Sequence, residues 1–173
     1  MRRFARVTIL GFVALIVLMY GVIPRADWEK RGAEIFAQEK CLALALYWEG
    51  LISEPLDGLR AIAWVVFNRI ESKHFPDTIC DVVSESTGEL YKCQFTFACD
   101  GKIDMPQNGI RWLKYLALAF WWKNVSAGGD LTAGSTHYYA HKLVTPDWLK
   151  DMGGCYIIGN HTFCRSQRRG SDV

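Results

Sequence analysis

The chain has 173 residues, a length that fits one domain of ordinary size with a short appendage. Its 20 lysines and arginines against 18 aspartates and glutamates give a formal net charge of +2, without the strong, clustered basic excess of a nucleic-acid-binding protein. Hydrophobic residues make up 50% of the chain and charged residues 22%, which excludes intrinsic disorder for its bulk.

An uncharged run from Val7 to Ile23 follows three arginines at the N-terminus. The run is at the short end of what spans a bilayer as a helix, and the preceding arginines favour a cytoplasmic N-terminus with a translocated remainder. A small-residue cleavage site is not evident near Tyr20–Ala26. We therefore expect an inner-membrane signal anchor with the domain in the periplasm or cell envelope. The alternatives are a cleaved signal peptide, which would release a secreted protein, and a buried core helix.

The spacing of apolar residues predicts that most of the remaining chain is helical. A first helix is expected over Asp27–Trp48 and a second from Pro55, followed by short helices over Asp77–Ser84 and Pro146–Asp151. The segment Ile110–Asn124 is apolar on nearly all sides, which predicts the central buried helix. The apolar face expected for the second helix consists of Leu59, Ile62, Ala63, Val66, Phe67 and Ile70.

The six cysteines suggest disulfides, because an exported domain folds in an oxidising compartment. The segment Cys155–Cys164 is predicted to form two strands around a Gly159-Asn160 turn. A two-residue turn there places the end cysteines opposite each other with Cα atoms about 4.5 Å apart, within disulfide range. We expect that bond, and we assign Cys93–Cys99 and Cys41–Cys80 without a geometric argument. Structural zinc is disfavoured, because the sequence has neither C-x-x-C nor H-E-x-x-H.

Glu49 ends the first predicted helix, directly after Leu46-Tyr47-Trp48. Apolar surroundings disfavour a charged carboxyl, and the negative end of the helix dipole acts in the same direction. Such a carboxyl stays protonated near neutral pH and can give its proton to a leaving oxygen. The alternative is a surface glutamate at a fraying helix end. Glu54 and Asp57 lie at the start of the second helix, where the dipole favours acids, and we interpret both as mainly structural.

Several segments occur in the order found in a known family. They are Cys41–Glu49, Ser53–Gly58, Ala61–Arg69, His74–Val83, Cys93–Gly101, Thr136–Tyr139, Pro146–Trp148 and Ile158–Phe163. Together they resemble the SleB-type cell-wall hydrolases, which include spore-cortex-lytic enzymes. Each segment alone is weakly specific, whereas several in the same order are strongly so.

The resemblance implies a mostly α (α+β), lysozyme-like helical domain with a small C-terminal β-hairpin, here preceded by the anchor helix. It implies cleavage of the peptidoglycan glycan strand in cell-wall remodelling or lysis, of the muramidase or lytic transglycosylase type, with Glu49 catalytic. Lytic transglycosylases use one carboxyl group, whereas a hydrolytic glycosidase needs two. The four residues between Glu49 and Glu54 are more than the family usually has, and a usual arginine is missing, so Glu54 is the alternative catalytic position.

The resemblance also points to a substrate groove formed by Gln94, Phe95, Phe97, His137 and Tyr138. Aromatic faces suit sugars and an amide suits an N-acetyl group, while ordinary strand packing is the alternative. His137 and His141 are four residues apart, but no carboxylate or cysteine accompanies them at a fixed spacing. We therefore expect no metal and no cofactor.

We divide the chain into an anchor at residues 1–24, a linker with the start of the first helix at 25–40, the hydrolase domain at 41–165 and a polar tail at 166–173. Peptidoglycan strands and the membrane are the expected partners of a monomer, and nucleic acid is not. The competing hypothesis is a membrane-anchored wall-binding or envelope-structure protein that has lost activity. The presence of Glu49 favours the enzyme.

Overall fold

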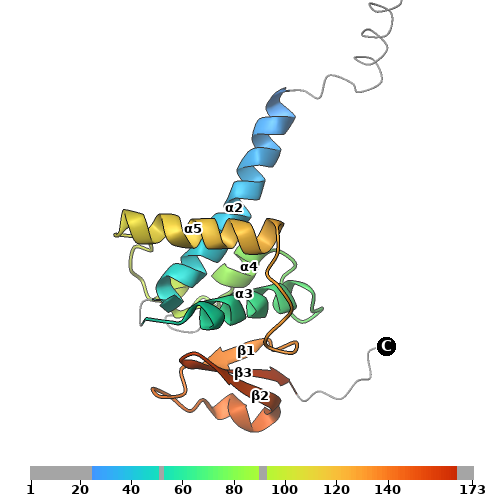
Figure 1. The fold of residues 1–173 in the computed structure, drawn as a ribbon, viewed down its shortest axis with the longest axis vertical. Helices are drawn as coiled ribbons and strands as arrows, with labels where there is room; N and C mark the ends of the chain where they lie inside the picture. The colour runs from blue at the N-terminus through green and yellow to red at the C-terminus, as the bar shows by residue number, and fades with distance from the viewer. Residues whose placement is uncertain (1–24, 51–52, 90–92, 167–173) are drawn as a thin grey trace, which may run out of the picture. The chain divides into compact units, whose positions relative to one another are not determined.

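The computed structural model describes residues 25–50, 53–89 and 93–166, and the run Val7–Ile23 lies outside them. The elements are α2 (Arg25–Glu49), α3 (Leu56–Ile70), α4 (Ile79–Ser84), η2 (Thr96–Cys99), α5 (Gly109–Asn124), β1 (His137–Tyr139), η3 (Asp147–Asp151), β2 (Met152–Ile158) and β3 (His161–Ser166) (Figure 1). The chain divides into two compact units, residues 1–36 and 37–173. No helix in the described ranges is both long enough and apolar enough to cross a bilayer.

Helix α3 supplies the centre of the core. Pro55 precedes its first turn, and the expected apolar face is confirmed, with Leu59, Ile62 and Val66 buried. The C-terminal half of α2 adds further fully buried side chains, among them Leu42 and Leu46. An amphipathic helix of this kind is stabilised mainly by burying its apolar face, so α3 fixes the positions of the elements around it.

Helix α4 confirms the short helix expected over Asp77–Ser84. Thr78 caps it by accepting a hydrogen bond from the Asp81 N–H, which satisfies one of the free donors of the first turn. The Cys41–Cys80 disulfide joins α4 to α2, and the Cys80 N–H donates to the side-chain oxygen of Gln38 at 3.1 Å. These bonds fix the C-terminal half of α2 against α4, and Glu49 lies at the end of that half.

The sheet is antiparallel with strand order β1-β3-β2, and the hairpin expected within Cys155–Cys164 is confirmed. Ile158 pairs with His161 across the turn, and Gly159 takes φ 61° at the first central position, as a type II′ turn requires. β2 begins at Met152, earlier than the expected Cys155, and its register against β3 shifts between Gly153 and Tyr156.

All three disulfides of the structure coincide with the pairs named from the sequence. Cys155 and Cys164 are joined with Cα atoms 4.2 Å apart, and Cys41–Cys80 and Cys93–Cys99 complete the set. Cys93–Cys99 closes a short loop that contains η2 and three of the residues expected in the groove, Gln94, Phe95 and Phe97. The cross-links therefore restrain the hairpin and this loop.

Helix α5 is not the central buried helix that its sequence predicted. Only Tyr115, Ala119 and Trp122 are buried, and they lie on one side of the helix. The outward side is also apolar but exposed in the structure. A helix that is apolar on all sides can be buried, but the pattern does not show which of its faces other elements cover. In this fold the centre of the core is formed by α3 instead.

Candidate active site

Glu49 is the last residue of α2 and is half-buried. Burial raises the pKa of its carboxyl to about 7, and the nearby negative charge of Glu54 acts in the same direction. A hydrogen bond from the Tyr138 hydroxyl and the positive charge of Arg69 act to lower it, but burial dominates. The carboxyl therefore carries a proton in a large share of molecules at neutral pH, as a general acid must.

Tyr138 reaches Glu49 from the middle of β1. Its ring stacks on Phe163 of β3 with centroids 5.6 Å apart, and it lies nearly perpendicular to the His161 ring with centroids 5.3 Å apart. Burial raises the pKa of the hydroxyl well above its usual value, and the Glu49 charge adds to this. Tyr138 thus remains a neutral hydrogen-bond donor to the carboxyl.

Arg69 brings a positive charge to the same place from the last turn of α3. Its Nε donates to the Thr136 carbonyl at 2.8 Å, and its guanidinium lies over the rings of Phe75 and Phe95, 5.2 and 5.6 Å from their centroids. Burial lowers the pKa of the guanidinium, whereas Tyr138, Glu85 and Glu49 raise it. A buried guanidinium stays charged, and here it favours the ionised form of Glu49.

Glu54 precedes the first turn of α3, as the sequence indicated, and its carboxyl is buried against the hairpin. Its side chain is 1% exposed, its Oε1 accepts the Asn160 N–H at 3.1 Å, and its Oε2 lies 3.2 Å from His161 Nδ1. A Cβ at Gly58 or Gly159 would collide with this carboxyl. Glu54 therefore connects the start of α3 to the tip of the hairpin, through contacts that the sequence did not indicate.

Asp57, in contrast, is exposed. Its carboxylate forms an ion pair with Arg60 at 3.2 Å, one turn along the helix, and its side chain is 70% exposed. Pairs of this kind contribute between 0 and about 1 kcal/mol. Of the three carboxylates that the sequence singled out, Asp57 faces solvent and Glu54 is engaged with the hairpin, which leaves Glu49 as the candidate proton donor.

Two hollows, of about 370 and 630 Å³, share lining residues and together form a groove. Glu85, Gln94 and His137 line both of them. Trp148 lies in the wall of the smaller hollow, and Phe75 lies in the wall of the larger one. The centroid of the His137 ring is 5.4 Å from that of Trp148 and 6.0 Å from that of Phe75. Aromatic and polar groups of this kind suit a sugar chain. Glu49 is not among the residues that line these two hollows.

The expected groove residues are thus only partly brought together. Gln94 and His137 line the groove, and Tyr138 contacts Glu49 instead. Phe95 as a groove wall was wrong, because its ring is fully buried between Phe97, Tyr138 and Arg69.

Phe97 is half-buried and stacks on Trp48 at 6.3 Å. It lines a third hollow, of about 240 Å³, together with Ser86 and Glu89. Sequence reasoning missed Glu85, Phe75 and Trp148 as groove residues. Phe75 and Trp148 fall within segments that carry the family resemblance, whereas Glu85 lies outside all of them.

His137 and His141 do not lie on a common helix, since His137 belongs to β1 and His141 follows that strand. Among the described residues, no group of three or more His, Cys, Asp or Glu side chains is placed to hold a metal ion. Burial and the nearby Arg69 charge lower the pKa of His137, so its ring is neutral at pH 7.

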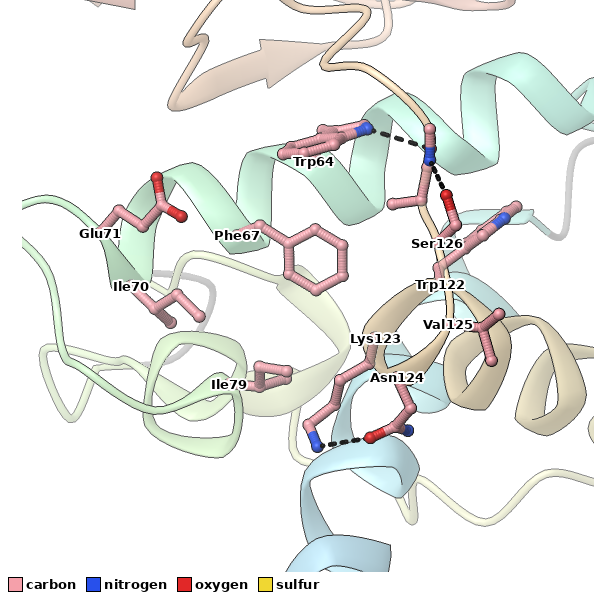
Figure 2. A pocket seen from close by; sticks show the side chains of 12 residues that line it. Trp64, Phe67, Ile70, Glu71, Ile79, Trp122, Lys123, Asn124, Val125 and Ser126 are labelled. Atoms are coloured by element: carbon pink, nitrogen blue, oxygen red, sulfur yellow. Dashed lines mark hydrogen bonds between the residues drawn. The ribbon is translucent and has the colours of Figure 1, made fainter.

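A separate hollow of about 460 Å³ lies where α3, α4 and the end of α5 meet. Figure 2 shows Phe67 and Trp64 of α3 facing Trp122 and the segment after α5, where Trp64 donates to the Ala127 carbonyl at 3.4 Å. Neither Glu49 nor any of the groove residues lines this hollow. It is therefore separate from the carboxyl that would donate the proton.

The family model described as "Cell Wall Hydrolase" matches residues 53–164, beginning four residues after Glu49. The spore cortex-lytic enzyme of Halalkalibacterium halodurans is 32% identical over 124 residues, covering 71% of this chain and 33% of that protein. The enzyme of the same description from Bacillus subtilis is 30% identical over 125 residues, covering 72% and 36%. The chain thus spans little more than a third of the length of these curated relatives.

Two solved structures share the fold, a mostly helical domain with a small antiparallel sheet. The catalytic domain of the Bacillus cereus SleB protein aligns with a TM-score of 0.54 and 29% identity, covering 74% of this chain and 89% of that one. The Bacillus anthracis structure, described as the catalytic domain of a germination-specific lytic transglycosylase, aligns with a TM-score of 0.55 and 29% identity, covering 74% and 93%.

Proposed function

The chain belongs to the cell wall hydrolase family, and from this premise we propose that it cleaves the glycan strand of peptidoglycan with Glu49 as the proton donor. The observation that carries the proposal is the pKa of about 7 for a half-buried carboxyl that also receives a hydrogen bond from Tyr138. Structural carboxylates paired with cations have lowered pKa values, whereas acids that protonate a leaving group have raised ones.

In the proposed reaction, Glu49 protonates the glycosidic oxygen as the bond to the sugar breaks. The resulting carboxylate is stabilised by the Tyr138 hydroxyl and by the Arg69 charge, both already in place. Such preorganised groups need no rearrangement as the charge develops. The same carboxylate then accepts a proton from the 6-hydroxyl of the sugar, which closes an anhydro ring. This transglycosylase route uses one carboxyl group in two roles and agrees with Glu54 being engaged elsewhere.

The groove supplies the binding surface for the glycan in this proposal. His137, Trp148 and Phe75 present aromatic faces to the sugar rings, and the exposed amide of Gln94 can bond an N-acetyl group. A strand of several sugars needs an open, elongated site, and the two hollows that share Gln94 and His137 provide one.

We further propose that Val7–Ile23 anchors the protein in the inner membrane, with the domain on the envelope side. The support is the sequence alone, namely the uncharged run and the arginines that precede it. A reporter fused to the C-terminus and active only outside the cytoplasm should be active. Activity of a reporter that works only in the cytoplasm would contradict this topology.

The function is tested by the release of soluble fragments from purified peptidoglycan. Glu49→Gln preserves the shape of the side chain but cannot donate a proton, so the rate should fall at least about 10²-fold. Glu71→Gln is the matched control, because Glu71 is exposed just after α3, and its rate should equal that of the wild type. An unchanged rate for Glu49→Gln would refute the assignment, and no release by the wild type would favour the wall-binding alternative.

A further inference from the structure

Helix α5 has a second apolar face that faces solvent in the structure. Ile110 is 85% exposed, Leu113 63%, Trp121 55% and Phe120 46%. At about 100° per residue these positions, with the exposed Ala117 between them, lie on one side of the helix, within an arc of about 100°. The buried residues of α5 lie on the opposite side. Adjacent exposed apolar residues on one helix face indicate an interaction surface.

The charges of α5 have one sign. The helix contains Arg111, Lys114 and Lys123 and no acidic residue. Lys123 is engaged with Glu39 at 3.0 Å, whereas Lys114 is exposed at the edge of the apolar face. Aliphatic and aromatic side chains on one face, bordered by basic residues, are the composition of helices that lie in the surface of an anionic bilayer.

We propose that the exposed face of α5 docks on the surface of a membrane rich in anionic lipid. Tryptophan and phenylalanine favour the level of the headgroups, and the exposed Lys114 at the edge of the face can meet a lipid phosphate. Arg111 is turned inward instead, with its guanidinium 5.7 Å from the centroid of the Tyr47 ring. A second copy of the chain fits less well, because a two-fold contact through this face would bring the two Lys114 side chains together. The uncharged run Val7–Ile23, which we propose as an anchor, would tether the chain to a bilayer.

This docking would orient the groove. Helix α5 and the sheet both contact α3, and Figure 1 shows them on opposite sides of it. A bilayer against α5 therefore leaves the sheet, with His137 and Met152 of the groove, directed away from the membrane. The inference goes beyond the proposed reaction, because it rests on the exposed side chains of α5 and not on the carboxyl of Glu49 or its partners.

The test is the depth of Trp121, measured with the full chain in phosphatidylglycerol vesicles whose acyl chains carry bromine, which quenches tryptophan on contact. The wild type should lose a larger fraction of its emission than Trp121→Phe, because the variant lacks the tryptophan that enters the bilayer. Trp64→Phe is the matched control, since Trp64 is half-buried on α3, and its quenched fraction should not fall below that of the wild type.

A second variant, Leu113→Glu, adds a negative charge to the docking face. It should lower the quenching of tryptophan emission by the vesicles and leave the release of peptidoglycan fragments in solution unchanged. This inference and the proposed function can therefore fail separately. Equal quenching of the wild type and Trp121→Phe would overturn the proposal. So would a vesicle-free dimer in which the α5 amides gain protection from hydrogen exchange.

Discussion

The raised pKa of Glu49 has a consequence for stability that can be measured without substrate. A carboxyl whose pKa is higher in the folded state than in the unfolded state adds stability at low pH, and this stability is lost as the pH rises through the folded value. For Glu49 the change is from 4.5 to about 7, which corresponds to about 3 kcal/mol. The wild type should therefore lose that amount between about pH 4.5 and pH 7 through this group alone.

Glutamine at this position is neutral at every pH, so Glu49→Gln should not lose this stability. We expect the variant and the wild type to have similar free energies of unfolding at pH 4, and the variant to be more stable by up to about 3 kcal/mol at pH 8 to 9. Urea titrations with the disulfides intact measure both values. Glu71→Gln, an exposed control, should stay within about 0.5 kcal/mol of the wild type at each pH.

A stability difference between Glu49→Gln and the wild type that is the same at pH 4 and pH 9 would refute the reasoning. It would mean that the carboxyl ionises in the folded protein as it does in water. A carboxyl of that kind would be ionised at neutral pH, and its use as a proton donor would lose its physical basis.

Three further predictions follow from individual contacts. Tyr138→Phe removes a hydrogen-bond donor that favours the ionised form of Glu49. The pKa that limits the rate on the alkaline side of a pH–rate profile should therefore move upward from about 7, and a downward shift would contradict the contact. Glu54→Ala leaves the Asn160 N–H and the neutral His161 ring of the hairpin without their partner and should cost about 1–3 kcal/mol of stability in urea titrations, whereas a loss below about 0.5 kcal/mol would show that the carboxylate is not engaged. Serine at both Cys155 and Cys164 should lower stability by about 2–3 kcal/mol, with thermal unfolding as the measurement and an unchanged midpoint as the contrary result.

Local patterns predicted the local structure well. The apolar face of α3 and the pairing of Ile158 with His161 depend on spacing within a short segment, and both were correct. A helix face repeats every three or four residues and a two-residue turn fixes the strand register, so neither needs a distant partner.

The features that the sequence did not predict depend on contacts between distant segments. Glu54 is buried because Asn160 and His161, more than a hundred residues later in the chain, contact its carboxyl. No local sequence pattern predicts that contact. The exposure of α5 and the burial of Phe95 depend in the same way on which neighbours cover which face. The position of Glu49 at a helix end was readable, but its bond to Tyr138 required the sheet.

The central claim, that Glu49 drives cleavage of the glycan strand, is tested most directly by mass spectrometry of the products released from purified peptidoglycan. We predict soluble fragments with anhydro-sugar ends from the wild type and none above background from Glu49→Gln. Fragments with reducing ends would retain the glycan as substrate but replace the one-carboxyl route with hydrolysis. Fragments cut only in the peptide stems, or equal release by Glu49→Gln, would contradict the account.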